Sequence, residues 1–214
     1  MIHLELVKRT DPRYQDMRDR HYVSNKGTHG QQLHYLIFDE GRHVGIISGA
    51  SPVYGVAARD RFFSLPADRK RKEAVLNQII NNVVFRIEQT RKNLATQTLA
   101  LWRRRIAEDW EYLYQVPVLG FETFVVEEDH RKGTLYLADN WTFLGKTAGT
   151  TKAHHKTAGG GGLDTAHTRR TVEKKLVFCI RRKKVKQIES YESSWRDKDR
   201  SRELAARRRR LFDG

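Results

Sequence analysis

The chain has 214 residues, of which 38% are hydrophobic and 31% charged, with a formal net charge of +15 and a mean hydropathy of −0.71. This length suffices for one domain with its own core, and no apolar run is long enough to predict a membrane-spanning helix. The N-terminus lacks the long apolar segment that is typical of a secretion signal, so we expect a cytoplasmic protein. The single cysteine, Cys179, lies in the apolar run LVFCI and is predicted to be a buried thiol.

The positive charge is concentrated toward the C-terminus. Residues 169–214 contain 17 Lys or Arg against 7 Asp or Glu, a net of +10, whereas residues 1–168 carry a net of only +5. Clusters of this kind bind phosphate backbones through counterion release. A solvated basic tail and an acidic lipid surface are the alternatives, but no apolar helix face accompanies the charge. We therefore expect nucleic acid as the partner, and no membrane.

The N-terminal part of the chain predicts a strand, a helix and a hairpin. Residues 2–7 alternate apolar and polar side chains, as a half-buried strand does. Asp11 and Pro12 can begin a short helix that ends near His21, because Pro is favoured at the first helical position. After a polar loop, the runs LHYLIFDE and HVGIISGA predict two strands joined by a tight turn.

The central part predicts helices on both sides of a buried strand. The run RFFSL predicts a short strand or a helical turn, and helical spacing extends over residues 67–81. The run NNVVFRIEQ (81–89) then predicts the buried strand. The clearest helix spans residues 94–115, where six apolar side chains recur at steps of three and four: Ala95, Leu99, Trp102, Ile106, Trp110 and Leu113.

The remaining elements complete a mixed fold. Strands are predicted over 118–128 and 174–188, and between them a short helix over 133–141 and a strand end over 142–147. This order predicts an α/β (α+β) protein in which helices flank a mixed, mostly antiparallel sheet.

Two segments, a loop within this domain and a tail after it, differ in composition from the rest of the chain. Residues 145–171 are rich in Gly and Thr and are expected to form a mobile loop. The residues after Ser193 predict a charged helix without an apolar stripe, which should fray unless a partner orders it. We therefore expect a domain over residues 1–190, followed by a basic helical or disordered tail over 191–214.

The succession of strand, polar turn and amphipathic helix over residues 81–115, followed by a strand and a short helix ending LYLADNWTFLG, is similar to the Gcn5-related N-acetyltransferase fold. In that family, the loop after the central strand and the next helix N-terminus hold the pyrophosphate of acetyl-CoA. The resemblance implies an acyl-CoA cofactor at Arg91, Lys92, Asn93 and Ala95, with basic side chains in place of the usual glycines. An ordinary basic turn before a helix would explain the same residues.

A second resemblance covers about residues 21–147. It rests on the ordered motifs HY, VGIISGAS, ARDRFF, INNVVFRI, LATQTL, RRRIAEDWEYLYQVPVLGFETFV and GTLYLADNWTFLGKT. This set resembles the DruA family of Druantia anti-phage systems, which implies a role in phage–host conflict and partners among other defence proteins. It is also similar in layout to the Mom-type DNA modification enzymes of phages, which are acetyltransferase-like and share the HY and NW pairs. That likeness implies acyl-type transfer to a DNA base.

Four residues are candidates for catalysis. His21 precedes a polar loop, and a histidine there is suited to general-base chemistry, unless it only caps or fills the core. Tyr22 completes the HY pair. Glu122 lies in the middle of a predicted strand, where a carboxylate is either buried with a partner or lines a cleft. Asn140, in the NW pair, would position a base.

The candidate nucleic-acid contacts are an aromatic residue and a set of cations. Trp141 would stack on a base, unless it belongs to the core, and Arg59 would contact nucleic acid, unless it forms a structural ion pair with Asp60. Lys and Arg clusters suit backbone contact rather than base readout. The other candidates are Lys146, Arg181, Arg182, Lys183, Lys184, Arg207, Arg208, Arg209 and Arg210.

No metal site is predicted, because His154, His155 and His167 have neither companion cysteines nor a fixed ligand spacing. Two functions remain. The first is an acyltransferase-like enzyme that modifies DNA, which the candidate acid–base residues favour. The second is a non-catalytic DNA-binding subunit of a defence complex, which the missing glycines over residues 89–95 favour.

Overall fold

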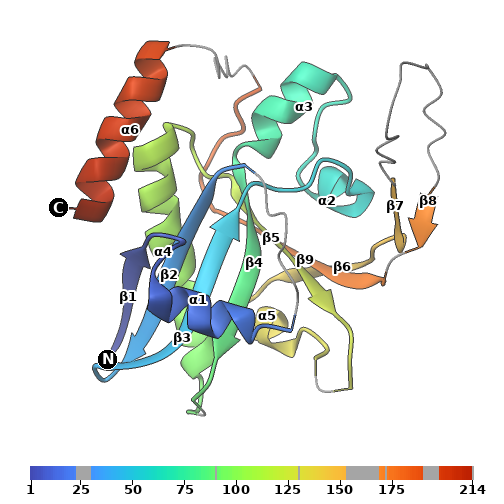
Figure 1. Cartoon of the computed structure of the whole chain (residues 1–214). Helices are drawn as coiled ribbons and strands as arrows, with labels where there is room; N and C mark the ends of the chain where they lie inside the picture. The colour runs from blue at the N-terminus through green and yellow to red at the C-terminus, as the bar shows by residue number, and fades with distance from the viewer. Residues whose placement is uncertain are drawn as a thin grey trace, which may run out of the picture.

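Seven strands form one mixed sheet with helices on both faces (Figure 1). The computed structural model describes residues 1–22, 30–89, 91–129, 131–152, 169–171, 173–189 and 198–213. The strand order is β1-β2-β3-β4-β5-β9-β6, and β7 and β8 form a separate two-stranded sheet. β4 and β5 run parallel, whereas all other neighbours in the large sheet are antiparallel. The predicted mixed, mostly antiparallel sheet with flanking helices is confirmed.

The strands are β1 (Ile2–Val7), β2 (Gln32–Asp39), β3 (Arg42–Ala50), β4 (Ile79–Ile87), β5 (Gly120–Val126), β6 (Thr142–Lys146), β7 (Thr150–Lys152), β8 (Arg169–Thr171) and β9 (Lys175–Arg181). The helices are α1 (Pro12–Asp19), α2 (Ala57–Phe62), α3 (Arg69–Leu76), α4 (Leu94–Tyr114), α5 (Thr134–Ala138) and α6 (Lys198–Asp213).

α4 covers one face of the sheet and supplies most of the core on that side. Trp102 and Trp110 of α4 are fully buried in one apolar cluster with Tyr35 and Phe121 of the sheet. Gly49 of β3 allows this close packing, because a Cβ there would lie 2.4 Å from a side chain of α4. The apolar spacing that predicts this helix therefore also forms the core.

α1 covers the opposite face of the sheet. Tyr14 and Met17 of α1 pack in a second cluster with Leu36 and Ile46. Side chains alternate between the faces of a strand, so Leu36 contacts α1 whereas its neighbour Tyr35 belongs to the cluster beneath α4. Cys179 is a buried free thiol in a third cluster, beside α2 and α3, as predicted.

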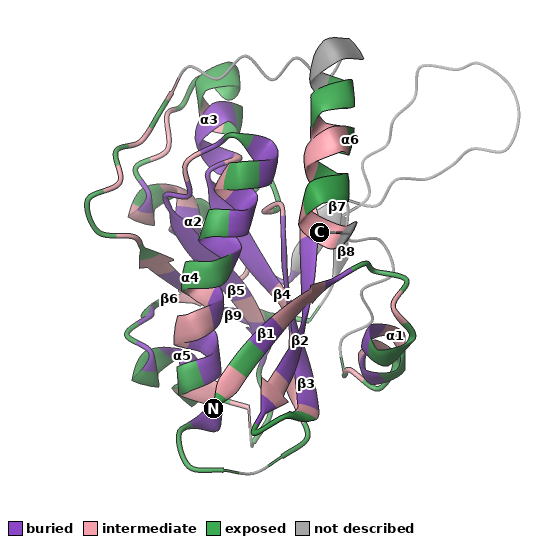
Figure 2. Ribbon diagram, turned by 90° about the vertical axis from the view of Figure 1, so that its left-hand side faces the viewer, coloured by how far each residue is buried: buried purple, intermediate pink, exposed green. Residues whose placement is uncertain are grey.

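α6 packs against the domain. Leu204, Leu211 and Phe212 of α6 contact the cluster beneath α4, and α6 lies beside α4 (Figure 2). Leu211 and Phe212 lie seven and eight positions after Leu204, so all three side chains fall on one side of the helix. The expectation that this helix has no apolar stripe is therefore wrong. The predicted division at residue 190 stays a prediction, since residues 190–197 lie outside the described part.

Other element bounds differ from the expectations. The helix predicted over 67–81 is α3 and ends at Leu76, because Ile79 and Asn81 already pair in register with β5. RFFSL belongs in part to a helical turn, α2. Within the segment 145–171, the structure describes β7 and β8, while residues 153–168 lie outside the described part and the predicted mobility is not tested.

Candidate functional site

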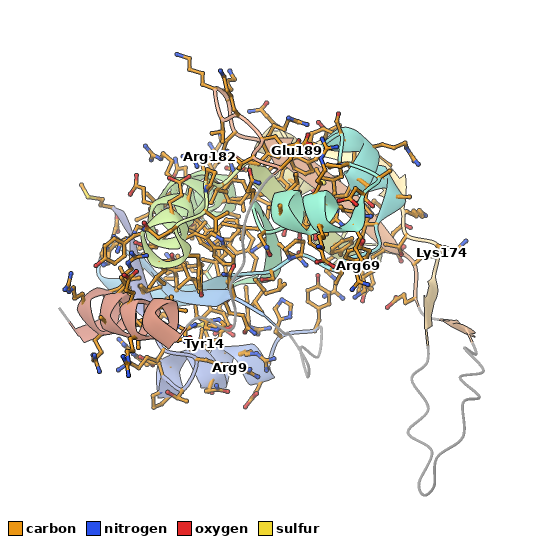
Figure 3. All side chains as sticks on the ribbon, turned by 90° about the horizontal axis from the view of Figure 1, so that it is seen from above. Arg9, Tyr14, Arg69, Lys174, Arg182 and Glu189 are labelled. Carbon is orange, nitrogen blue, oxygen red and sulfur yellow. The ribbon has the colours of Figure 1, made fainter. Side chains whose placement is uncertain are left out.

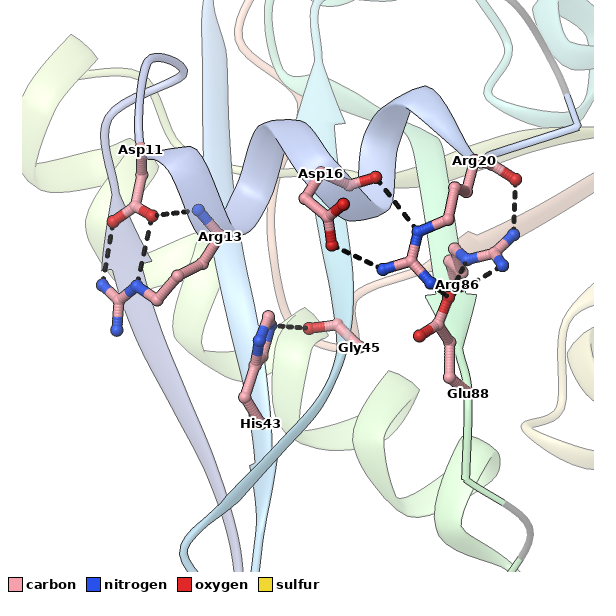
Figure 4. A network of polar contacts seen from close by, with 8 residues as sticks. All are labelled: Asp11, Arg13, Asp16, Arg20, His43, Gly45, Arg86 and Glu88. Carbon is pink, nitrogen blue, oxygen red and sulfur yellow. Dashed lines mark hydrogen bonds and ion pairs between the residues drawn. The ribbon is translucent and has the colours of Figure 1, made fainter.

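A network of arginines and carboxylates fixes α1 against the end of β4 (Figure 4). Arg20, which caps α1, pairs with Glu88 just beyond β4 at 2.7 Å. Arg86 of β4 pairs with the same carboxylate at 2.8 Å and donates to the backbone carbonyl of Arg20 at 2.5 Å. The next residues in the chain, His21 and Tyr22, are therefore held beside β4.

The two parallel strands of the sheet diverge along their length. β4 and β5 pair over Ile79–Asn82 and Gly120–Thr123, but they continue to Ile87 and Val126. Beyond the paired segments, the facing edges of β4 and β5 do not bond to each other. In open α/β sheets, the carboxyl ends of parallel strands are the usual place for a ligand.

Tyr136 of α5 joins both strands where they diverge. Its hydroxyl donates to Oδ1 of Asn82, the last paired residue of β4, at 2.9 Å. Oγ1 of Thr123 on β5 donates to the Asn82 carbonyl at 3.0 Å and lies 3.4 Å from the Tyr136 hydroxyl. Gly133 begins this turn with a φ of 72°, and a Cβ there would lie 2.2 Å from the Phe178 ring, so no other residue type fits.

The Tyr136 phenol is neutral and acts as a donor. Burial raises the pKa of Tyr136, and the nearby Tyr22 raises this pKa further, although the bond to Thr123 lowers it. A phenol with a raised pKa keeps its proton at physiological pH and can donate it within a hydrogen bond. A protonated hydroxyl, fixed by its hydrogen bond to Asn82, therefore lies where β4 and β5 diverge.

His21 and Tyr22 lie against the segment that follows β5, through a contact between Tyr22 and Arg131. The rings of His21 and Tyr22 lie 4.6 Å apart, and the Arg131 guanidinium stacks on the Tyr22 ring at 3.8 Å. Arg131 also pairs with Glu128. Tyr22 is 44% exposed, so its edge is accessible to a ligand while Arg131 covers one ring face. The structure thus brings two of the four catalytic candidates together.

Glu122, the third catalytic candidate, is sealed in a buried ion pair. Its Oε2 lies 2.6 Å from Nη1 of Arg59, and both side chains are fully buried. Arg59 also pairs with Asp60 at 2.7 Å. Burial raises the pKa of Glu122 to about 7, although Arg59 lowers it. Of the two possibilities for Glu122, burial with a partner is confirmed.

In the Arg59–Glu122 pair, the arginine has more hydrogen-bond partners than the carboxylate. Arg59 also donates to the backbone carbonyls of Val53 at 2.8 Å and Tyr54 at 3.1 Å, so the arginine is well satisfied. Within the described part, Oε1 of Glu122 and Oδ1 of its register partner Asn81 have no hydrogen-bond partner. When Glu122 is protonated, its carboxyl group can donate a hydrogen bond instead of only accepting one. Two unpaired acceptors then no longer face each other, which agrees with the raised pKa of Glu122.

The NW pair follows α5, with Asn140 at the surface and Trp141 in the core. Asn140 is exposed, with a φ of 63°, and its backbone N–H donates to Leu137 at the end of α5. Trp141 is 3% exposed and donates to Asp139, which in turn accepts two bonds from Arg103 of α4. The prediction that Trp141 stacks on a base is wrong, and its alternative as a core residue is confirmed.

The loop between β4 and α4 carries the predicted cofactor residues. Arg91 pairs with the buried Asp39 at 2.7 Å, so its charge is already balanced. Lys92 is exposed and, within the described part, has no ion pair. Asn93 caps α4 in the left-handed conformation, with no side-chain bond to the helix. The amides of Ala95 and the next residue also have no acceptor among the described residues.

The basic candidates fall into two classes. Arg59 is fully buried, so the prediction that it contacts nucleic acid is wrong, and its pairing with Asp60 is confirmed. Three others already have protein partners: Lys146 pairs with Glu127, Arg182 pairs with Glu111, and Arg181 lies over the ring of Phe63. Arg207 pairs with Glu203 along α6. The remaining candidates are exposed, and none of them forms an ion pair with a described residue: Lys183, Lys184, Arg208, Arg209 and Arg210.

Neither a metal centre nor a membrane span is found in the part of the chain that the structure describes. No group of three potential ligands gathers among those residues, and none of the described helices is long and apolar enough to cross a membrane. His154, His155 and His167 lie outside the described residues.

A comparison with protein-family models matches residues 2–187 to the family described as Druantia protein DruA. The chain belongs to the DruA family. This match covers most of the chain and confirms the resemblance that the ordered motifs indicate. No curated protein matches the sequence of this DruA-family chain.

Solved structures support the fold of this DruA-family protein. A Bacillus subtilis acetyltransferase in complex with CoA has 7% identity and a TM-score of 0.50, covering 85% of this chain and 99% of that chain. NAA60 of Arabidopsis thaliana in complex with acetyl-CoA has 10% identity and a TM-score of 0.52, covering 85% and 98%. The fold is therefore that of the Gcn5-related N-acetyltransferases, whereas activity does not follow from fold.

Sequence reasoning missed the residues that organise this site of the DruA-family protein. Tyr136 and Asn82 are 54 positions apart, and neither stands out from local pattern alone. Tyr136 does lie in the motif GTLYLADNW, with the strained Gly133 at its start. A glycine before a short aromatic helix is the signal that could have drawn attention to it.

Proposed function

We propose that this DruA-family protein acts on DNA during defence against phage, as an acyltransferase-like enzyme that modifies a base. The observation that carries the proposal is the protonated Tyr136 hydroxyl, held by Asn82 where the parallel strands diverge. A hydroxyl fixed in its protonated form at such a point can stabilise a leaving group through a hydrogen bond. The fold itself is shared with acetyltransferases, and the C-terminal charge suits a nucleic-acid substrate.

The N-terminus of α4 fits the pyrophosphate of an acyl-CoA. The amides of Ala95 and Thr96 have no acceptors among the described residues, and a helix N-terminus with such amides favours an anion. Lys92 adds an exposed charge beside them, whereas Arg91 is balanced by Asp39. When bound, an acyl-CoA supplies an acyl group activated as a thioester.

His21 and Tyr22 are then the residues that meet the acceptor base. They are fixed beside β4 by the Arg20–Glu88 pair, on the same side as Tyr136, whose pKa Tyr22 influences. In this role His21 accepts a proton from the base amine, and the exposed edge of Tyr22 contacts the base. Glu122 has no direct role, because its side chain is fully buried against Arg59. It acts as a structural residue of β5.

Binding of acyl-CoA tests the transferase directly. At a ligand concentration of about 100 times Kd, a site of this kind stabilises the fold by about 2.7 kcal/mol, which raises Tm by roughly 5–10 °C for a domain of this size. The shift should shrink in Lys92→Glu and persist in Arg42→Glu, an exposed matched change in the β2–β3 turn. No shift with any acyl-CoA would contradict the CoA-dependent reaction.

A second candidate function is a non-catalytic DNA-binding subunit of a defence complex. The specific observation in its favour is that Glu122 and Trp141, two polar or aromatic candidates for the site, are withdrawn into the core. The loop before α4 also lacks the glycines usual at a pyrophosphate site. DNA binding without any acyl-CoA shift would favour this second function.

A further inference from the structure

A hollow of about 390 Å³ lies between α6 and the strands β1 and β2 at the edge of the sheet. We call this hollow the α6 groove, and its lining includes Lys8, Arg9, His34, Arg208, Arg209 and Phe212. Lys8 and Arg9 follow β1, His34 lies in β2, and the other three belong to α6. Its size is in the range of pockets that hold small ligands or single nucleotide units.

The charge of the α6 groove is entirely positive. Four of its lining residues are Lys or Arg and none is Asp or Glu. Arg9 and Arg209 form no ion pair with any described residue, in contrast to Arg13 nearby, which pairs with Glu5 and Asp11. Arg9 and Arg209 carry like charges, and no described carboxylate pairs with either, so their positions favour an anion.

A tyrosine lies near the cations on each side of the α6 groove. Arg208 is held near the hydroxyl of Tyr114, whose pKa it lowers through a hydrogen bond, against the larger effect of burial. On the other side, Arg9 lies close to Tyr14 at the lower left of the view from above (Figure 3). Because α6 docks through Leu211 and Phe212, its arginines face the domain rather than bulk solvent alone.

The floor of the α6 groove combines a buried histidine with apolar surface. His34 is 7% exposed; its Nδ1 contacts Oγ of Ser48 at 3.0 Å, and its Nε2 has no partner among the described residues. Burial, together with a smaller effect of the nearby Arg9, lowers the pKa of His34 to about 4. The ring is therefore neutral and can offer one N–H to an acceptor. Phe212 and Leu33 supply apolar surface beside it.

We infer that the α6 groove binds a nucleotide unit of single-stranded DNA, with the phosphate on the arginines from both sides and the base on the apolar floor. The inference rests on the proposed action on DNA and specifies where the strand is held. Duplex DNA presents phosphates but keeps its base faces stacked, whereas a single strand offers both. An acidic protein partner would complement the positive charge of the α6 groove. It would not account for the apolar surface of Phe212 inside the same narrow hollow.

Two matched pairs of charge reversals test the inference. Arg209→Glu alters the groove, and Arg61→Glu makes the same change at an exposed position of α2 outside it. Arg9→Glu and Arg42→Glu form the second pair, inside and outside the groove. Binding of a labelled 20-nucleotide single strand, the chosen probe, is followed by fluorescence anisotropy over a range of salt concentrations with the full chain. Thermal unfolding of each variant confirms that it is folded.

We expect Arg209→Glu and Arg9→Glu to weaken binding about tenfold or more and to reduce the salt slope by about 0.7 for each lost contact. The outside variants should change affinity by less than about threefold, and the duplex of the same sequence should bind more weakly. Equal losses in both members of each pair, or tighter duplex binding, would overturn the inference while leaving DNA binding intact. Absence of any DNA binding by the unaltered protein would instead overturn the proposed function itself.

Discussion

The Arg59–Glu122 pair and the α6 groove both bring arginine side chains to a protected place, but the charge is balanced in only one of them. Arg59 is fully buried and meets two carboxylates and two backbone carbonyls. The arginines of the α6 groove meet no carboxylate among its lining residues. The first arrangement is complete within the protein, whereas in the second no described carboxylate pairs with Arg9 or Arg209.

This difference separates structural charge from charge that is available for binding. A buried ion pair must be satisfied internally, because an unpaired charge there is costly. A groove at the surface keeps its cations hydrated, so unbalanced charge is tolerated and can be exchanged for phosphate. Variants of the two regions should therefore fail in different measurements, stability in one and DNA affinity in the other.

The largest effect is expected when Glu122 is removed. Glu122→Ala leaves the Arg59 guanidinium buried with only Asp60 as its carboxylate partner, and such a loss costs about 3–5 kcal/mol. Urea unfolding measures it. The matched control is Glu127→Ala, which breaks an exposed pair with Lys146 and should cost less than about 1 kcal/mol. Similar losses in both variants would show that the Arg59–Glu122 pair is not specially important.

The same pair should make stability depend on pH. Burial raises the pKa of Glu122 from 4.5 to about 7, so the folded protein holds a proton that the unfolded chain releases between these values. The free energy of unfolding should therefore fall as pH rises from 5 to 7, by on the order of 3 kcal/mol at about 1.4 kcal/mol per pKa unit. Glu122→Gln removes the titrating group, so its curve should lack this component. Parallel curves for both proteins would contradict the raised pKa.

A smaller effect is expected at the divergence of β4 and β5. Tyr136→Phe leaves Oδ1 of Asn82 without its donor in a buried place, which costs about 1–3 kcal/mol. Affinity for single-stranded DNA should stay unchanged, since the α6 groove is lined by other elements. Tyr112→Phe on α4, at a position 41% exposed, is the control and should be nearly neutral. A loss of DNA affinity in Tyr136→Phe would show that the divergence of β4 and β5 and the α6 groove are not independent.

The fold was more accessible to prediction than the site. α4 follows from apolar residues at steps of three and four, and the β2–β3 hairpin follows from alternation around a short turn, because both signals are local. The end of α3 was missed because Ile79 and Ile80 continue the helical spacing of Ala74 and Leu76, although pairing with β5 makes both isoleucines part of β4.

The contacts that define both regions are distant in the sequence. Arg59 and Glu122 are 63 positions apart, and the groove joins residues that follow β1 to residues near the C-terminus. The motifs predicted two alternatives for Arg59 and Glu122, and tertiary burial decided between them. For α6, the run of four arginines concealed an apolar side formed by Leu204, Leu211 and Phe212.

Mass spectrometry of nucleosides, from DNA of cells that express the protein, tests the central claim most directly. We expect a new acylated nucleoside with the unaltered protein, its loss in His21→Ala and Tyr136→Phe, and its reduction in Arg209→Glu. Unmodified nucleosides in cells that contain abundant folded protein would contradict the claim that this DruA-family protein modifies DNA.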